Sequence, residues 1–588
     1  MPNVDFAKKA VVKVQKRSAF DKSFRNLLTT KCGTLTPLLC DEVIPNTTVN
    51  LKLAISATLP PLASETFMNV NLKAEAFFVP SRLIMLGFDQ WVQGNDTIQV
   101  GTAAANFTDQ KLRVPVITIN PSVSANTPYY APGSLLDYLG FRITNLSSTV
   151  DICALPVLAY NLLYDTWYRN PLVQKSPFDD DDTYYTGTNW YPFNMRYKKP
   201  CDKANYGYSC VPWVGMRDGV PFCALRQRNF GSDYFTTATP SPQNGPAQKI
   251  QMFLPSVSNR FLAEAAGGDE ASISSDNTFV SEEGFYIKNG NFYYHDGTSV
   301  DTSSPTPVAE FTISSLRACN SLQQWLERNQ LSNNKYVDFL KAQYNANLKD
   351  SIAQRPVYLG SASFPVYSKG IYQTAKDSSS SNNPFDSVAS RYGHAYAEGS
   401  SFIIDHYTAQ EHGYIMVLVS VVPEVTYSGG VNKYLMRYVD ASSYGEVANP
   451  ILQNVGPEPI RCYEFDYTLN DDDSFGVFGY TDRFASWMTR NHELHGLLRD
   501  GQSLESFALQ RTGLSDGIGN QFLQIPTNYM DQVTAVDSSI SNYGIWIDSY
   551  LDYKVVMPLA KYSIPSLQDP AYEHGDSVVV NRRGRIME

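Results

Sequence analysis

Alternating hydrophobic and polar positions predict two β-strands near the start of the chain. In "MNVNLKAEAFFVP" (68–80), Met68, Val70 and Leu72 begin a row of apolar residues at every second position, with polar residues between them. The stretch "VNLKLAIS" (49–56) has the same pattern. Because successive side chains of a strand point to opposite faces, one row lies on a core and the other faces solvent or a second layer.

Later segments add two strands and three helices. The β-branched run "YIMVLVSVV" (414–422) predicts a strand buried on both faces, and "DYKVVMPLAKY" (552–562) predicts another strand. Hydrophobic residues at helical spacing predict helices over 155–170, 314–329 and 503–513. The last of these ends on a glycine, the residue preferred just beyond a helix C-terminus.

Long polar stretches separate these elements, among them 176–192, 245–307 and 376–384. Within the second stretch, "KNGN" (288–291) predicts a hairpin, because Asn-Gly accepts the positive φ of a tight turn. Strands near both ends of the chain, with helices and loops between, favour a mainly β fold, an antiparallel sandwich whose sheets pair distant segments. A parallel α/β fold would need strands and helices in regular alternation, and the order here is irregular.

Length and composition narrow the class of protein. With 588 residues the chain exceeds the roughly 250–300 at which a single core stops growing, so it has several domains or one scaffold with long insertions. Its 38 tyrosines either fill a β-rich core or cover surface buried against another protein. No stretch approaches the roughly 18 apolar residues of a membrane span, so we expect no membrane insertion. The eight cysteines contain no CxxC, which predicts reduced thiols.

Motifs for catalysis or metal binding are incomplete. "GLSDG" (513–517) matches GxSxG but lacks the preceding strand that a nucleophile elbow requires. "HELH" (492–495), His406 and His412 lack the further ligands of a metal site. The acidic run Asp179–Asp182 lacks the spaced ligands of a calcium loop, and a solvated acidic loop is favoured. We therefore expect no enzyme activity, no catalytic residue, no metal and no cofactor.

Positive charge is concentrated at the start of the chain. Residues 1–31 hold eight basic and two acidic side chains, a net +6, so that a chain of net charge -11 carries -17 in its remainder. Basic residues interleaved with Val, Phe and Ser suit nucleic-acid phosphates, whereas the alternative is a solvated, disordered tail. The candidate nucleic-acid-binding residues here are Lys8, Lys9, Lys13, Lys16, Arg17, Lys22 and Arg25.

Seven stretches, read together, resemble the major capsid protein of microviruses, small icosahedral phages with circular single-stranded DNA. They follow in order from about residue 17 to about residue 510. Ser428-Gly429-Gly430 departs from the family's QQG, and Trp487-Met488 stands where EYR is typical. The stretches are "RSAFDKSF…GTLTPLLCDEVIPNTTVNL", "AEAFFVPSRLIM", "LPVLAYNLLYDTWYRN", "RQRNFGSDYFTTATPSPQNGP", "ISSLRACNSLQQWLERN…KYVDFLKAQYN…QRPVYLG", "EHGYIMVLVSVVPEVTYSGGV" and "FGVFGYTDRFASWM".

The resemblance implies an eight-stranded viral jelly roll with long, partly helical insertions, self-assembling into a T=1 shell around single-stranded DNA in the bacterial cytoplasm. It implies a basic arm (1–44), a jelly-roll domain (45–245 and 311–588) and an inserted loop (246–310) that forms a protrusion at the threefold axis. The arm and a second basic segment with Arg582, Arg583 and Arg585 are then expected in the lumen. Small DNA-binding, scaffolding or pilot proteins of the same virus are the expected companions.

The inserted loop is also the expected point of contact with a host receptor. In this hypothesis the outer hairpin of the protrusion supplies the contact residues, namely Phe285, Tyr286, Asn289, Phe292, Tyr293 and Tyr294. A rival interpretation is a secreted or periplasmic glycan-binding β-sandwich, since aromatic loops such as "TNWYPF" (188–193) stack on sugar rings. That rival predicts a monomer with an export signal, and the N-terminal sequence has no signal-like apolar region.

Overall fold

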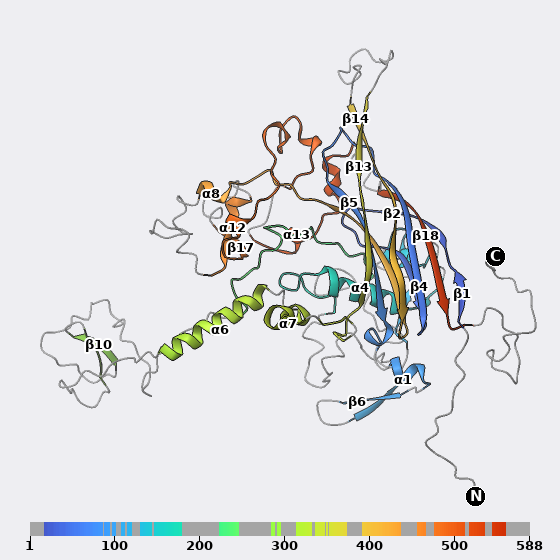
Figure 1. Ribbon diagram of the computed structural model, residues 1–588, viewed down its shortest axis with the longest axis horizontal. Coiled ribbons are helices and arrows are strands. Elements are labelled where there is room, and N and C mark those ends of the chain that lie inside the picture. Colours follow the sequence, from blue (N-terminus) through green and yellow to red (C-terminus); the bar gives the residue numbers. More distant parts are fainter. Residues whose placement is uncertain are drawn as a thin grey trace, which may run out of the picture. The chain divides into compact units, whose positions relative to one another are not determined.

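A computed structural model describes most of the chain (Figure 1). The described residues are 17–85, 88–94, 97–101, 107–111, 114–119, 130–143, 146, 148–178, 223–245, 284–288, 291–295, 313–331, 335–346, 348–350, 352–372, 391–436, 456–465, 476–511, 517–535 and 544–559.

Two antiparallel sheets form the centre of the fold. The six-stranded sheet has the order β1-β18-β4-β14-β13, with β2 also paired to β18, and the four-stranded sheet has the order β12-β5-β15-β3. The strands are β1 (Ser18–Asp21), β2 (Phe24–Thr30), β3 (Thr36–Val43), β4 (Thr47–Thr58), β5 (Val70–Pro80), β12 (Val357–Pro365), β13 (Tyr367–Tyr372), β14 (Arg391–Ala409), β15 (Gly413–Pro423) and β18 (Ile545–Met557). Residues 18–43 of the predicted arm therefore belong to the sheets.

The pairing of the strands supports the predicted jelly roll. A jelly roll is a long two-stranded antiparallel ribbon wrapped into two sheets, so its first strand pairs with its eighth, its second with its seventh, and so on. All four such pairs are present: β2 with β18, β3 with β15, β4 with β14, and β5 with β12. Contacts between β18 and β4 and between β15 and β5 complete the sheets.

Side-chain burial follows the alternation in the sequence. In β4 every second residue from Thr47 to Ala57 is buried, and β5 alternates in the same way at its start. β15 is buried along its whole length, as its continuous apolar sequence predicts. Its residues alternate between two cores, because Ile415 and Val417 lie in the sandwich core whereas Met416 and Leu418 lie in a second core behind the four-stranded sheet.

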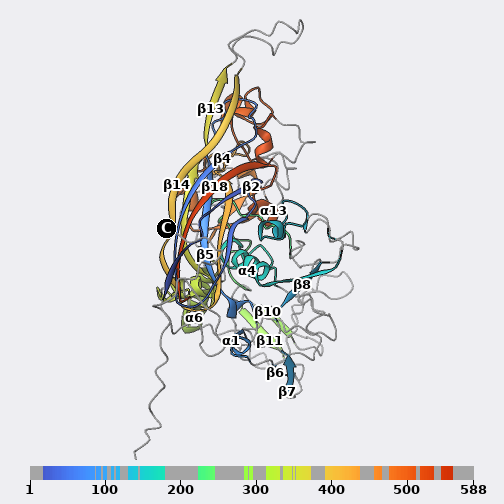
Figure 2. The same cartoon turned by 90° about the vertical axis from the view of Figure 1, so that its right-hand side faces the viewer.

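That second core is covered by segments inserted between β5 and β12. Helix α4 (Leu155–Leu163) lies against this face of the four-stranded sheet (Figure 2). The remaining described elements of the jelly-roll unit are short. They are α1 (Phe88–Val92), β6 (Thr97–Gly101), β7 (Phe107–Lys111), β8 (Val116–Ile119), α3 (Leu135–Tyr138), β9 (Val150–Cys153), α7 (Tyr336–Tyr344), α8 (Lys433–Met436), β16 (Glu458–Arg461), β17 (Val477–Thr481), α12 (Ala485–Met488) and α13 (Asn520–Leu523).

Of the three predicted helices, two are confirmed and one is wrong. α4 continues into a single π-helical turn (Tyr164–Tyr168), and α6 spans Ile313–Leu331. The segment 503–513 has only a 3-10 turn (Glu505–Phe507), after which the described chain is extended. There Arg511 donates its backbone N–H to the carbonyl of Thr426 and places its guanidinium 3.8 Å from the centroid of the Phe522 ring. These long-range contacts override the local helical spacing.

Residues 243–334 form a compact unit of their own, separate from residues 1–242 and 335–588. This unit contains α6 and the hairpin of β10 (Gly284–Lys288) and β11 (Asn291–His295), whose antiparallel register confirms the predicted "KNGN" hairpin. Within the unit, the backbone N–H of Asn244 donates to the carbonyl of Leu326 on α6.

The described cysteines are all free thiols, in agreement with the predicted reduced state; they are Cys32, Cys40, Cys153, Cys223, Cys319 and Cys462. Burial raises the pKa of the Cys32 thiol to about 12. None of the helices in the described ranges is both long and apolar enough to span a bilayer.

Candidate assembly and nucleic-acid surfaces

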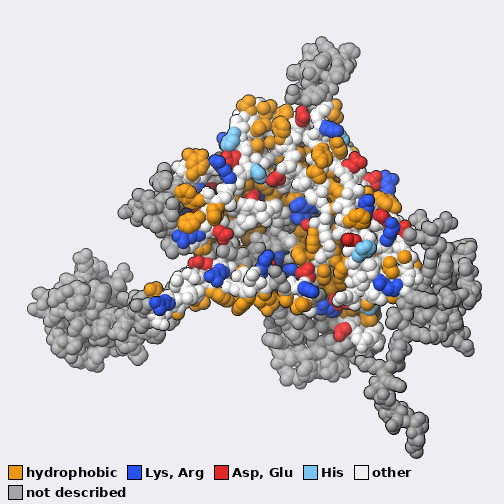
Figure 3. All heavy atoms as spheres, in the orientation of Figure 1, with side chains coloured by type: hydrophobic (Ala, Val, Ile, Leu, Met, Phe, Trp, Pro, Cys, Tyr) orange, Lys and Arg blue, Asp and Glu red, His pale blue; other side chains and the backbone are white. Residues whose placement is uncertain are grey.

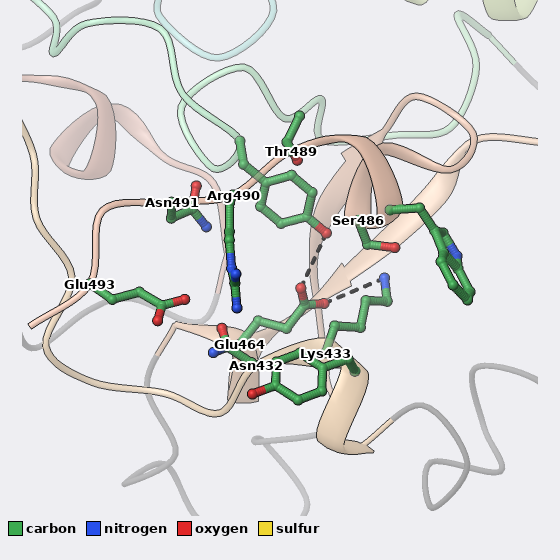
Figure 4. Close-up of a pocket in the computed structure, with 11 residues that line it drawn as sticks. Asn432, Lys433, Glu464, Ser486, Thr489, Arg490, Asn491 and Glu493 are labelled. Atoms are coloured by element: carbon green, nitrogen blue, oxygen red, sulfur yellow. Dashed lines mark hydrogen bonds and ion pairs between the residues drawn. The ribbon is translucent and has the colours of Figure 1, made fainter. Parts of the chain in front are cut away.

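An open pocket of about 290 Å³ lies beside α8, α12 and the 3-10 turn that ends at Glu464 (Figure 4). Lys433 and Glu464 line its floor, and Trp487 and Arg490 also line it. These residues come from segments far apart in the sequence, so the tertiary structure alone creates the pocket.

The floor of the pocket is a buried ion-pair cluster. The Lys433 ammonium lies 2.9 Å from Glu458 Oε1 and 3.5 Å from Glu464 Oε1, and the Tyr234 hydroxyl lies 3.1 Å from Glu464 Oε2. Burial raises the pKa of Glu464, and the nearby ammonium of Lys433 opposes this rise. Two carboxylates thus share one cation in a site that excludes most water.

This cluster holds four surface elements together. Ser486 on α12 donates a hydrogen bond to Glu458, so the cluster joins β16, the turn at Glu464, α8 and α12. Removing the cation would leave two uncompensated buried carboxylates, a loss of roughly 3–5 kcal/mol of stability. The arrangement positions surface elements and offers no nucleophile activated by a base.

Exposed apolar side chains lie around the buried ion-pair cluster. Tyr434 and Leu435 on α8 are exposed, as are Trp487 and Met488 on α12. Large apolar side chains gathered on a surface mark protein–protein contacts. Aromatic residues and methionine are also enriched in such interfaces. We define these four residues as the α8/α12 patch.

Three of the predicted nucleic-acid-binding residues, Arg17, Lys22 and Arg25, are described. Each contacts a strand of the six-stranded or the four-stranded sheet. Arg17 hydrogen-bonds Thr48 and the carbonyl of Val556. The Lys22 ammonium lies 2.5 Å from Asp41 Oδ2, and Arg25 forms a two-pronged ion pair with Asp548, with Nε 2.8 Å from Oδ1. The positive charges of Lys22 and Arg25 are therefore each compensated by a neighbouring aspartate. The other candidates, Lys8, Lys9, Lys13, Lys16, Arg582, Arg583 and Arg585, lie outside the described residues.

The predicted host-contact residues belong to one hairpin. Phe285 and Tyr286 lie in β10, and Phe292, Tyr293 and Tyr294 lie in β11. Their register pairs Phe285 with Tyr294 and Tyr286 with Tyr293. Asn289 lies outside the described residues.

Three of the described histidines, His406, His492 and His495, lie near carboxylates, whereas His394 and His412 contact aromatic rings. His492 Nε2 lies 3.1 Å from Glu424, and His495 Nε2 lies 3.3 Å from Glu493. Among the described residues, no group of three or more His, Cys, Asp or Glu could hold a metal ion. Ser515 of the "GLSDG" stretch and the run Asp179–Asp182 lie outside the described ranges.

Sequence reasoning missed the outer face of the six-stranded sheet. Three aromatic residues are exposed there, namely Trp546 and Tyr550 of β18 and Phe402 of β14. They lie in the solvent-facing row of their strands, and residues of the other row are buried. The signal was available, since "IWIDSYLDYKVV" places aromatic residues in the row that alternation assigns to solvent. The predicted strand 552–562 overlaps only the end of β18 (Ile545–Met557).

The chain matches the family described as capsid protein (F protein) over residues 10–567, and it belongs to that family. Capsid proteins are structural components of virions that assemble into multimeric shells. The predicted non-enzymatic, structural role is therefore confirmed, and the jelly-roll pairing of the strands agrees with it.

Its similarity to particular proteins is low in identity but covers most of each chain. The capsid protein VP1 of Chlamydia phage 1 is 24% identical, over 94% of this chain and 96% of the relative. Capsid protein VP1 of Bdellovibrio phage phiMH2K is 25% identical, over 94% and 95%. Capsid protein VP1 of Spiroplasma virus 4 is 22% identical, over 84% and 85%. The predicted membership among microvirus major capsid proteins is confirmed.

Proposed function

We propose that copies of this chain assemble into a T=1 icosahedral shell that encloses a circular single-stranded DNA genome, in the cytoplasm of a bacterial host. The observation that carries this proposal is the match to the capsid protein family across residues 10–567. The α8/α12 patch supports it, because exposed apolar surface of this kind suits contacts with further copies.

The proposed domain organisation follows the sequence prediction with one change. Because β1 to β3 lie within residues 18–43, we restrict the basic arm to residues 1–17. The jelly-roll domain then includes β1 to β3, and the insertion 246–310 forms an exterior protrusion at the threefold axis. The compact unit 243–334 includes this whole insertion.

The assembly proposal is tested by imaging. The chain expressed alone, or with companion proteins of the same virus, should yield uniform hollow particles in negative stain. A glycan-binding sandwich would stay monomeric at the same concentration and bind immobilised polysaccharide. Non-associating protein at high concentration would overturn the proposal.

The basic arm is proposed to hold the genome. Lys8, Lys9, Lys13, Lys16 and Arg17 carry five positive charges on a chain of net charge -11, and cations release counterions from nucleic acid. Arg582, Arg583 and Arg585 are a second proposed lumenal group. Exchanging the five arm residues for Gln should give shells that close but package less DNA, measured as the ratio of absorbance at 260 and 280 nm in purified particles.

A matched control for this experiment replaces solvent-exposed lysines outside the arm. Lys341 and Lys349 lie outside the arm, so a Lys341→Gln/Lys349→Gln variant should package normally. A normal genome content in shells of the arm variant would contradict the proposal.

We also propose that the hairpin β10–β11 contacts a host receptor. Its two strands contain Phe285, Tyr286, Phe292, Tyr293 and Tyr294, Asn289 follows the first strand in the sequence, and tyrosine is frequent in protein-binding surfaces. The proposal is supported by the separation of this unit from the jelly roll, because we expect a change in the unit to leave the jelly-roll fold intact.

A further inference from the structure

The outer face of the six-stranded sheet is centred on three neighbouring strands, β18, β4 and β14. On β18 the outward row is Trp546, Asp548, Tyr550, Asp552 and Lys554, and their neighbours on the inward row are buried. The outward row of β4 runs from Thr48 to Thr58. Figures 2 and 3 show that this face lies on the side of the sandwich opposite α4 and is open to solvent over β18, β4 and β14.

Three large rings stand on this face. Trp546 is 46% exposed, Tyr550 is 51% exposed and Phe402 is 59% exposed. The register sets Tyr550 opposite Ala54 of β4, and Ala54 opposite Ser400 of β14. Phe402 itself is opposite Lys52 of β4, so Lys52 stands between Phe402 and β18, whereas the small side chain of Ala54 lies beside Tyr550.

The charges on the face are nearly balanced. Arg25 pairs with Asp548, and Lys554 lies 3.1 Å from Asp552. The Lys52 ammonium lies 5.5 Å from the centroid of the Phe402 ring, and Glu398 is also exposed on β14. A face of this kind attracts phosphates weakly but presents flat apolar surfaces between hydrogen-bonding groups.

The first strand and the last strand of the chain meet at one end of this sheet. β1 begins at Ser18, which pairs with Met557 at the end of β18. Arg17 hydrogen-bonds the carbonyl of Val556 at the same place. The chain thus enters this sheet at Ser18 and leaves it at Met557, at one and the same end, and the two basic segments precede and follow these residues in the sequence. Attraction by the two segments and stacking on the sheet would act on one strand of nucleic acid.

We propose that the outer face of the six-stranded sheet binds unpaired bases of single-stranded DNA by stacking on Trp546, Tyr550 and Phe402. The inference rests on the proposed function, since it assigns the genome-facing side of the shell to this sheet. Stacking on aromatic side chains requires unpaired bases and tolerates any sequence. The face thus selects single-stranded over duplex DNA, whereas the basic segments attract both.

The test measures binding of oligo-deoxythymidine to the purified full-length chain before assembly, by fluorescence anisotropy at several salt concentrations. A Trp546→Thr/Tyr550→Thr/Phe402→Thr variant keeps residues that favour strands. We expect it to bind at least about fivefold more weakly, with the slope of log affinity against log salt unchanged, because stacking releases no counterions. The arm variant should instead lose about 0.7 of slope per contacting cation removed.

A Trp91→Thr variant is the matched control, because Trp91 is 39% exposed but lies on α1, outside the strands that carry the three rings. It should bind the oligonucleotide as the unmodified chain does. Equal affinity of the triple variant and the unmodified chain would overturn the inference, as would loss of particles without loss of affinity, which would assign the face to a second copy. If the unmodified chain forms no particles, the proposed function fails independently of this measurement.

Discussion

Gly360 illustrates how a single residue sets the distance between two strands. It lies at a bulge in β12, where the register with β5 shifts between Tyr358 and Gly360. A Cβ atom at Gly360 would lie 2.2 Å from the backbone carbonyl oxygen of Ile403 in β14. The neighbour is backbone rather than a flexible side chain, so it cannot yield without moving the strand.

A Gly360→Ala variant should therefore be less stable by roughly 1–3 kcal/mol, the usual cost of forcing extra atoms into a packed site. Chemical denaturation of the unassembled chain measures the difference. Gly519→Ala is the control, because Gly519 has an extended backbone (φ -138°) and no atom within 4 Å of the added Cβ. Equal midpoints for the two variants would show that β12 moves away from β14 freely.

The buried ion pairs of Lys433 could not be predicted from the sequence. Its partners Glu458 and Glu464 are ordinary surface-type residues in sequence, and only the fold buries all three together. A charged residue is rarely buried without a partner, but the sequence does not specify which partner it meets.

At the scale of elements, period-two alternation predicted strands well because it reflects a sheet with one buried face. β4 and β5 confirm it, and the continuous apolar run of β15 is explained by a sheet covered on both sides. The helix expected over 503–513 failed because Arg511 is buried against Phe230 and Phe522, contacts that no local pattern encodes.

The compact unit 243–334 gives a prediction at the same scale. Deleting 270–305 removes the β10–β11 hairpin and leaves α6 complete. Because the strands of the jelly roll lie outside the deleted residues, we expect particles to assemble normally while attachment to host cells falls. Particle yield in a density gradient and adsorption to cells measure the two effects.

A matched control for this deletion replaces 270–305 with a Gly/Ser linker of equal length. Attachment should fall in the linker variant as well, since the proposed contact residues are gone. Unchanged attachment in both variants would contradict the host-contact proposal.

At the scale of the whole molecule, the chain is a jelly roll interrupted by two long insertions, 81–356 between β5 and β12 and 424–544 between β15 and β18. The insertions cover one face of the four-stranded sheet and form the α8/α12 patch, whereas the outer face of the six-stranded sheet carries exposed rings. The four-stranded sheet is thus covered on its outer side, whereas the outer side of the six-stranded sheet is exposed.

The sequence by itself determined the main strands, the position of the hairpin, the concentration of positive charge before β1 and the membership in a capsid protein family. These are local properties, since they depend on spacing, composition and short motifs. The tertiary structure decided which strands pair and which faces stay exposed. Arg25 meets Asp548 across 523 positions of sequence, and no local pattern specifies a contact over such a separation, because it forms only when the closed sheet brings both strands together.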